Sequence, residues 1–96
     1  MTIETFEESL QENTPPDVSV YLTALWYDAK GDWQKAHHLI DSLGGKTAAA
    51  VHAYLHRMEG DNWNANYWYN RAGRSMPNLS LQEEWKALAN ELLRME

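Results

Sequence analysis

Three residues that can ligate a metal recur at helical spacing near the middle of the chain. His52, His56 and Glu59 stand at positions i, i+4 and i+7, so on a helix all three side chains project from one side. Imidazole nitrogens and carboxylate oxygens are common zinc ligands. A zinc-hydrolase helix carries Glu directly after its first His, whereas here Ala53 follows His52, and this disfavours metal-assisted hydrolysis.

A structural role explains the same histidines, and the sequence favours it. An imidazole ring donates one hydrogen bond and accepts another, so His52 and His56 can be satisfied by Tyr, Glu or backbone groups of a neighbouring helix. His37, on a separate predicted helix, could approach them and complete a three-His cluster, whereas His38 is expected to be exposed. We therefore predict no cofactor and no bound metal, and keep His52, His56 and Glu59 as the alternative metal site.

No other pattern in the sequence points to catalysis. Gly44-Gly45-Lys46-Thr47 matches only the end of a P-loop, and it lacks the first glycine and the preceding strand. The serines have no nucleophile-elbow context, and the absence of cysteine removes thiol nucleophiles, thiolate metal sites and disulfides. We predict that the protein is not an enzyme.

The elements that must position these residues form an internal repeat. Gly31-Asp32 and Gly60-Asp61 stand 29 positions apart, and each pair marks a turn in which Gly ends one helix and Asp caps the next. On both sides of each turn, apolar residues recur at i, i+3, i+4 and i+7, the spacing of one helix face. Before the turns these residues are Leu22, Leu25, Trp26 and Ala29, and then Val51, Tyr54, Leu55 and Met58; after the turns they are Ala36, Leu39, Ile40 and Leu43, and then Ala65, Trp68, Tyr69 and Ala72. Each copy is predicted to be a helix, a tight turn and a second helix.

Both copies resemble tetratricopeptide repeats in the turn and the second helix. The resemblance rests on GDWQKAHHLIDSL and GDNWNANYWYNRA, where Ala65, Tyr69 and Ala72 fit the family's small, aromatic, small pattern. Ala24 and Ala53 fit the small position of the family's first helix. The period of 29 is shorter than the family's 34, and the repeat-ending proline is missing from both copies. The resemblance implies two helical hairpins with a concave surface that binds a protein or peptide.

A narrower resemblance covers only the second copy. The segment HAYLHRMEGDNWNANYWYNRAGR, residues 52–74, resembles a segment of small uncharacterised bacterial and fungal proteins. It implies no activity. The same segment concentrates His, Arg and aromatic residues, so we expect any specific function to reside there.

Helices outside the repeat are predicted to close its ends. Thr2 can cap a short N-terminal helix, and Thr14 can cap the next helix with the two following prolines in its first turn. Ser80 and Glu83 form a capping-box pattern that opens a last helix. Repeats need such caps because each hairpin leaves an apolar face uncovered. We predict one all-α domain, a compact bundle of about six helices, with an N-terminal helix at 1–13, hairpins at 15–45 and 46–74, and a capping helix at 80–96.

A partner-binding surface follows from the repeat register. The first helices of the two hairpins would line it with Tyr21, Leu25, Asp28, Tyr54, Arg57 and Met58. Arg57 beside Tyr54 could engage a carboxylate or a peptide terminus, or could instead form a salt bridge with Asp28. Trp63 and Tyr67 fall outside the apolar stripe of the second hairpin and are also candidate contacts. We predict that the C-terminal helix covers this second aromatic face, with a homodimer as the alternative.

Composition narrows the class of partner. Fourteen acidic residues against eight basic ones give a formal net charge of −6, which repels phosphate backbones and anionic lipid. We therefore predict no nucleic-acid or membrane partner. The chain has no apolar run typical of a signal peptide or transmembrane helix, so a cytoplasmic location is expected.

Overall fold

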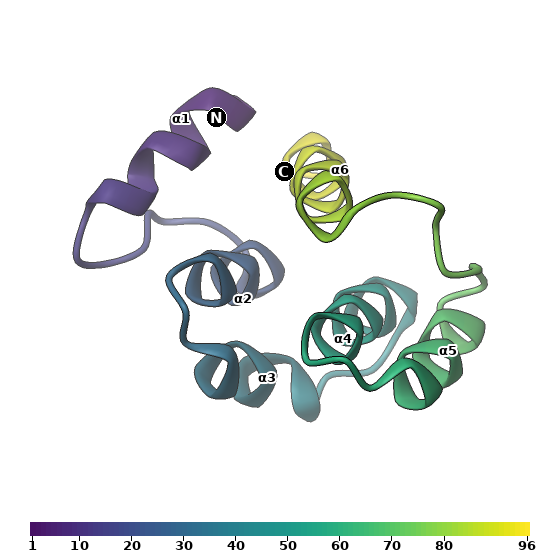
Figure 1. Cartoon of the computed structure of the whole chain (residues 1–96). Helices are drawn as coiled ribbons and strands as arrows, with labels where there is room; N and C mark the ends of the chain where they lie inside the picture. Colours follow the sequence, from purple (N-terminus) through teal and green to yellow (C-terminus); the bar gives the residue numbers. More distant parts are fainter.

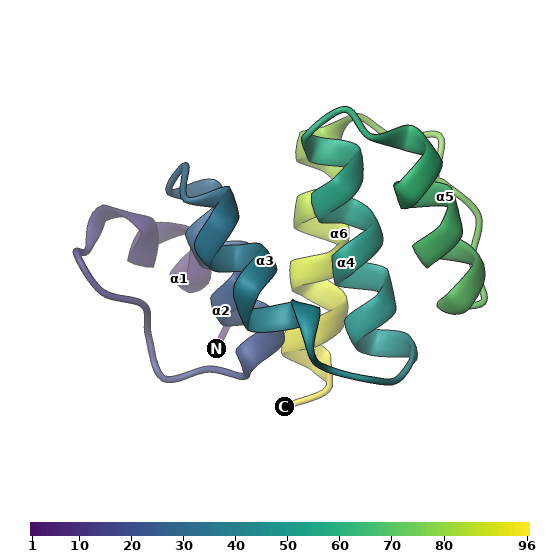
Figure 2. The same ribbon diagram turned by 90° about the horizontal axis from the view of Figure 1, so that it is seen from below.

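The chain folds into six α-helices and one short 3-10 helix, without strands, which confirms the predicted all-α class. A computed structural model describes residues 1–96. Its elements are α1 (Ile3–Glu8), η1 (Ser9–Gln11), α2 (Val20–Ala29), α3 (Trp33–Asp41), α4 (Lys46–Met58), α5 (Asn62–Arg71) and α6 (Leu81–Arg94). The pairs α2–α3 and α4–α5 form two successive hairpins, and α6 packs across α2 and α4 (Figure 1). Figure 2 shows α6 running alongside α4, on the side away from α5.

Both repeated Gly-Asp pairs form the predicted turns. Gly31 and Gly60 have φ angles of 86° and 85°, a left-handed conformation that is favourable for glycine and strained for other residues. The side chains of Asp32 and Asp61 then cap α3 and α5 by accepting hydrogen bonds from backbone N–H groups in the first turn. The local sequence therefore sets both hairpin turns.

The start of α2 differs from the prediction. The helix begins at Val20, and Ser19 caps it by accepting from the Leu22 N–H at 3.3 Å. Thr14 does not cap this helix, because Pro16 biases Pro15 away from the α region and no helix begins directly after Thr14. Thr2 and Ser80 do cap α1 and α6 as predicted, and Ser80 forms the full capping box.

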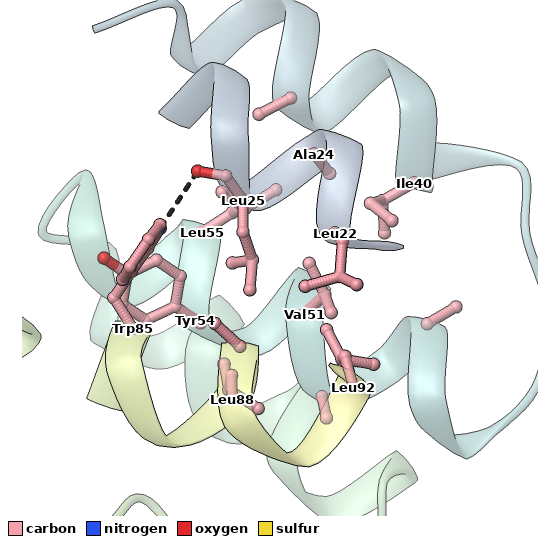
Figure 3. Close-up of a cluster of buried hydrophobic side chains, with 14 of the residues drawn as sticks. Leu22, Ala24, Leu25, Ile40, Val51, Tyr54, Leu55, Trp85, Leu88 and Leu92 are labelled. Carbon is pink, nitrogen blue, oxygen red and sulfur yellow. Dashed lines mark hydrogen bonds between the residues drawn. The ribbon is translucent and has the colours of Figure 1, made fainter. Parts of the chain in front are cut away.

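The core lies where α6 crosses α2 and α4. Leu88 and Leu92 of α6 point toward Leu22 and Val51, and all four side chains are buried (Figure 3). The Trp85 indole N–H donates to the Leu25 carbonyl at 2.9 Å, so a hydrogen bond also joins α6 to α2. The surface predicted to receive a partner is thus largely filled by a helix of the same chain.

The prediction that α6 covers the second aromatic face of α5 is wrong. Trp63 and Tyr67 remain 79% and 46% exposed. The apolar stripe of α6 is buried instead against α2 and α4, which offer a continuous aliphatic surface. No helix of the chain combines the length and apolar character needed to cross a membrane.

Candidate functional site

Three histidines from two helices converge at the junction of the hairpins. His37 comes from α3, and His52 and His56 come from successive turns of α4. One ring nitrogen from each lies within 4.8 Å of the others. The Nε2 atoms of His37 and His52 are 3.0 Å apart, close enough for one to donate a hydrogen bond to the other. The structure therefore brings together the three-His cluster that the sequence allowed.

Two tryptophans hold two rings of this cluster, those of His37 and His52, in place. Trp33 stacks on His37 with ring centroids 4.8 Å apart, and its own indole N–H donates to the Leu55 carbonyl at 2.7 Å. Trp68 stacks on His52 at 3.9 Å. Such packing fixes the ring planes, which a preorganised site requires. The sequence analysis did not assign these walls, although Trp33 stands one helical turn before His37 and so shares its face.

His56 is oriented by a carboxylate. Its Nδ1 lies 2.9 Å from the Glu59 Oε1 and can donate to it, which leaves Nε2 as the atom with an available lone pair. Metal-ligating histidines commonly donate their second nitrogen to a carboxylate in this way. Glu59 thus orients His56, and the ring nitrogens that lie together are those of His37, His52 and His56.

A second group of ligating atoms is less suited to a metal. His56, Glu59 and Asp61 also lie within 4.8 Å of one another. The Asp61 carboxylate, however, accepts from the Asn64 backbone and side chain as the cap of α5. These bonds lower the pKa of Asp61 and would be lost if it turned toward an ion.

His52 is held in its neutral form. Its side chain is buried, and burial together with the neighbouring His56 and His37 lowers the pKa of His52 from 6.5 to about 4. The nearby Asp41 opposes this shift only in part. Because neutral imidazole is the form that ligates metals, His52 needs no deprotonation at neutral pH.

The residues predicted to bind a partner are mostly committed to the fold. Leu25 and Tyr54 are buried under α6, and Tyr21 is partly buried against the core. Met58 is 44% exposed. Asp28 is buried. The predicted concave surface is therefore covered by α6 of the same chain and is largely not free to bind a partner.

Arg57 has a different ion-pair partner from the one predicted. It does not pair with Asp28, because its Nη1 donates to the Glu84 Oε1 at 2.8 Å and its Nη2 donates to the Leu79 carbonyl at 2.5 Å. The Tyr69 hydroxyl donates to the other Glu84 oxygen at 2.5 Å. The hydrogen bond with Glu84 raises the pKa of Arg57, and burial followed by the same carboxylate raises the pKa of Tyr69.

Glu84 is the partner of Arg57 that the sequence did not predict. It lies in the first turn of α6, where an acidic residue is explained by the helix dipole alone. Only the docking of α6 brings it to Arg57, and no local pattern predicts that docking.

Trp63 and Tyr67 form the one exposed aromatic area among the predicted contacts. Arg71 lies over the rings of Tyr67 and Trp68, 5.8 Å and 5.5 Å from their centroids. Both exposed rings stand on α5, on the side of the helix that α4 leaves uncovered.

Comparison with known proteins adds no further assignment: no protein-family model, curated protein or solved structure matches the chain. The likeness to tetratricopeptide repeats stays a prediction.

Proposed function

We propose that this protein binds a divalent transition-metal ion through the Nε2 atoms of His37, His52 and His56. The convergence of three histidine nitrogens within 4.8 Å is the observation that carries the proposal. In a tetrahedral zinc site with Zn–N bonds near 2.1 Å, ligand nitrogens stand about 3.4 Å apart. The separation of 3.0 Å between the His37 and His52 nitrogens is close to that value.

The donor set selects the class of ion. Three imidazoles suit zinc, copper, nickel or cobalt, whereas calcium and magnesium prefer oxygen ligands. The bound ion would replace the hydrogen bond between His37 and His52, with each ring keeping its proton on Nδ1. A fourth coordination position would be left for water or a small ligand.

Metal binding would join the two hairpins. His37 belongs to the first hairpin, and His52 and His56 belong to the second. An ion that bridges them binds the folded chain more tightly than the unfolded chain and therefore raises its melting temperature. We assign the protein a binding function without catalysis, because Glu59 already accepts from His56 and no other carboxylate of the cluster is placed as a general base.

The proposal is tested by measuring the melting temperature of the protein at increasing concentrations of zinc or nickel. Wild-type protein in a hundredfold excess of metal over the dissociation constant should gain about 2.7 kcal/mol of unfolding free energy. His56→Ala should abolish the gain. His38→Ala removes a histidine that is exposed on α3 and outside the cluster, and it should keep the gain in full. Equal stabilisation of all three proteins, or of none, would overturn the proposal.

A second candidate function is self-association through α5, and it is favoured by the exposure of Trp63 and Tyr67. Two aromatic side chains cover far less than the roughly 800 Å² per partner of a standard interface, so the dimer would be weak. Light scattering at two concentrations should show a concentration-dependent mass that Trp63→Ser reduces to that of a monomer. An unchanged monomer mass at both concentrations would contradict this candidate.

A further inference from the structure

A pocket of about 480 Å³ opens beside α6, away from the histidine cluster. It falls in the size range of small-molecule sites, roughly 300 to 1,000 Å³. Five helical segments, α1, η1, α2, α4 and α6, contribute to its lining, which includes Leu10, Asp28, Tyr54, Met58, Leu81 and Trp85. Tyr54 stands two residues from both His52 and His56, and this spacing places the pocket and the histidines on opposite faces of α4.

Asp28 is an unpaired buried carboxylate in the wall of this pocket. Its residue is 7% exposed, and it forms no salt bridge with any Lys, Arg or His. Carboxylates this deeply buried are normally paired with a cation. Burial raises the pKa of Asp28, and a hydrogen bond with the Tyr54 side chain only partly offsets the effect. The comparably buried Glu84, by contrast, is paired with Arg57.

The remaining walls are aromatic or apolar and are held in place. The Trp85 indole N–H donates a hydrogen bond to the Leu25 carbonyl, and the ring stacks on Phe6 with ring centroids 5.8 Å apart. Tyr54 is 2% exposed. Rings of this kind attract a cation to their faces and an alkyl stem to their surface.

Lys86 is the one cationic residue among those that line the pocket, and it is paired elsewhere. Lys86 lies at the rim, where its Nζ is 3.6 Å from the Glu7 Oε1. Both side chains are about half exposed. The rim pair is balanced in charge, so the Asp28 carboxyl group has no cation of the protein as its partner.

We infer that the pocket binds a small primary amine, with its ammonium group on the Asp28 carboxylate and its apolar stem against Trp85 and Tyr54. The amine supplies the counter-ion that the fold lacks, and the apolar walls select amines with a hydrocarbon stem over ammonium itself. The site is independent of metal binding, since none of its residues belongs to the histidine cluster.

The experiment is a titration of the 96-residue chain with n-hexylamine at neutral pH, monitored by ¹H–¹⁵N NMR. Saturable shifts should centre on the Trp85 indole N–H and the backbone around Asp28. Asp28→Asn should weaken binding about tenfold or more, as expected when a charge-assisted contact is lost. Asp17→Asn makes the same change at an exposed aspartate outside the pocket and should leave binding unchanged.

A second variant and other ligands test the same inference. Leu81→Trp should block binding by filling the pocket from α6, and it serves if Asp28→Asn does not fold. Equal affinity for 1-hexanol, no shifts with hexylamine, or undiminished binding by folded Asp28→Asn would each overturn the inference. Markedly tighter binding of Nα-acetyl-lysine amide, which keeps its side-chain ammonium group, would also overturn it. The cation would then come from a lysine side chain of a protein partner.

Discussion

The two faces of α4 use polar residues in opposite ways. On the inner face, Arg57 and Tyr54 lie under α6, and Arg57 is neutralised by Glu84. On the outer face, His52 and His56 lie against His37. The one carboxylate that contacts these three rings as an ion-pair partner is Glu59, which contacts His56. The inner face is completed by the chain itself. The outer face places three imidazole nitrogens close together, and it is the face to which we assign the proposed ion site.

The largest expected effect comes from breaking the inner face. Arg57→Ala leaves Glu84 buried without its cation, and loss of one partner of a buried pair costs about 3 kcal/mol of unfolding free energy. Chemical denaturation measures this loss. Arg71→Ala, which removes an exposed arginine from the aromatic rings of α5, should cost less than about 1 kcal/mol. A loss for Arg57→Ala no greater than that for Arg71→Ala would show that the inner pair does not support the fold.

Acid should weaken the outer face by a smaller amount. The pKa of His52 is about 4 in the folded state, because of burial and its two histidine neighbours, and 6.5 in the unfolded chain. The unfolded state therefore binds the proton first. The resulting loss of unfolding free energy is absent above pH 6.5, grows as the pH falls from 6.5 toward 4, and stays constant below pH 4.

Between pH 7 and pH 5 this linkage amounts to about 2 kcal/mol. It is measured as the difference in unfolding free energy between wild type and His52→Gln, both free of metal. The loss on acidification should be larger in wild type than in the variant. Parallel pH profiles for the two proteins would contradict the assigned state of His52.

Asp28→Asn tests the contrast between the buried carboxylates of Glu84 and Asp28, and its expected effect on the unfolding free energy is smaller still. Glu84 has a cation and Asp28 has none, so neutralising Asp28 should leave stability unchanged or raise it by up to about 1 kcal/mol at neutral pH. Thermal melting of the ligand-free protein checks this. A clear loss of stability would mean that the Asp28 carboxylate is already compensated within the fold.

The smallest effect is expected on α5. Trp63 is 79% exposed, so Trp63→Ser should change the unfolding free energy by no more than about 0.5 kcal/mol. Denaturation of the dilute protein provides the measurement. A larger loss would place Trp63 in the fold and remove it from any contact surface.

Local sequence rules account for much of this fold. The Gly-Asp turns and the capping box at Ser80 were predictable because the interactions join residues within one helical turn. The approach of His37 to His52 could be anticipated because only residues 42–45 connect α3 to α4, and such a short connection keeps successive helices adjacent. The docking of α6 could not, since an apolar stripe indicates that a helix is buried without indicating against which face. The partner of Arg57 was missed for the same reason.

The most direct test of the metal site is long-range ¹H–¹⁵N NMR of the imidazole nitrogens, with and without one equivalent of zinc. The Nε2 resonances of His37, His52 and His56 should shift together and saturate at one ion per chain, while those of His38 stay in place. If the His38 nitrogens shift with the others, or if the three cluster nitrogens do not respond to zinc, the histidines are part of the packing between the hairpins and not a metal centre.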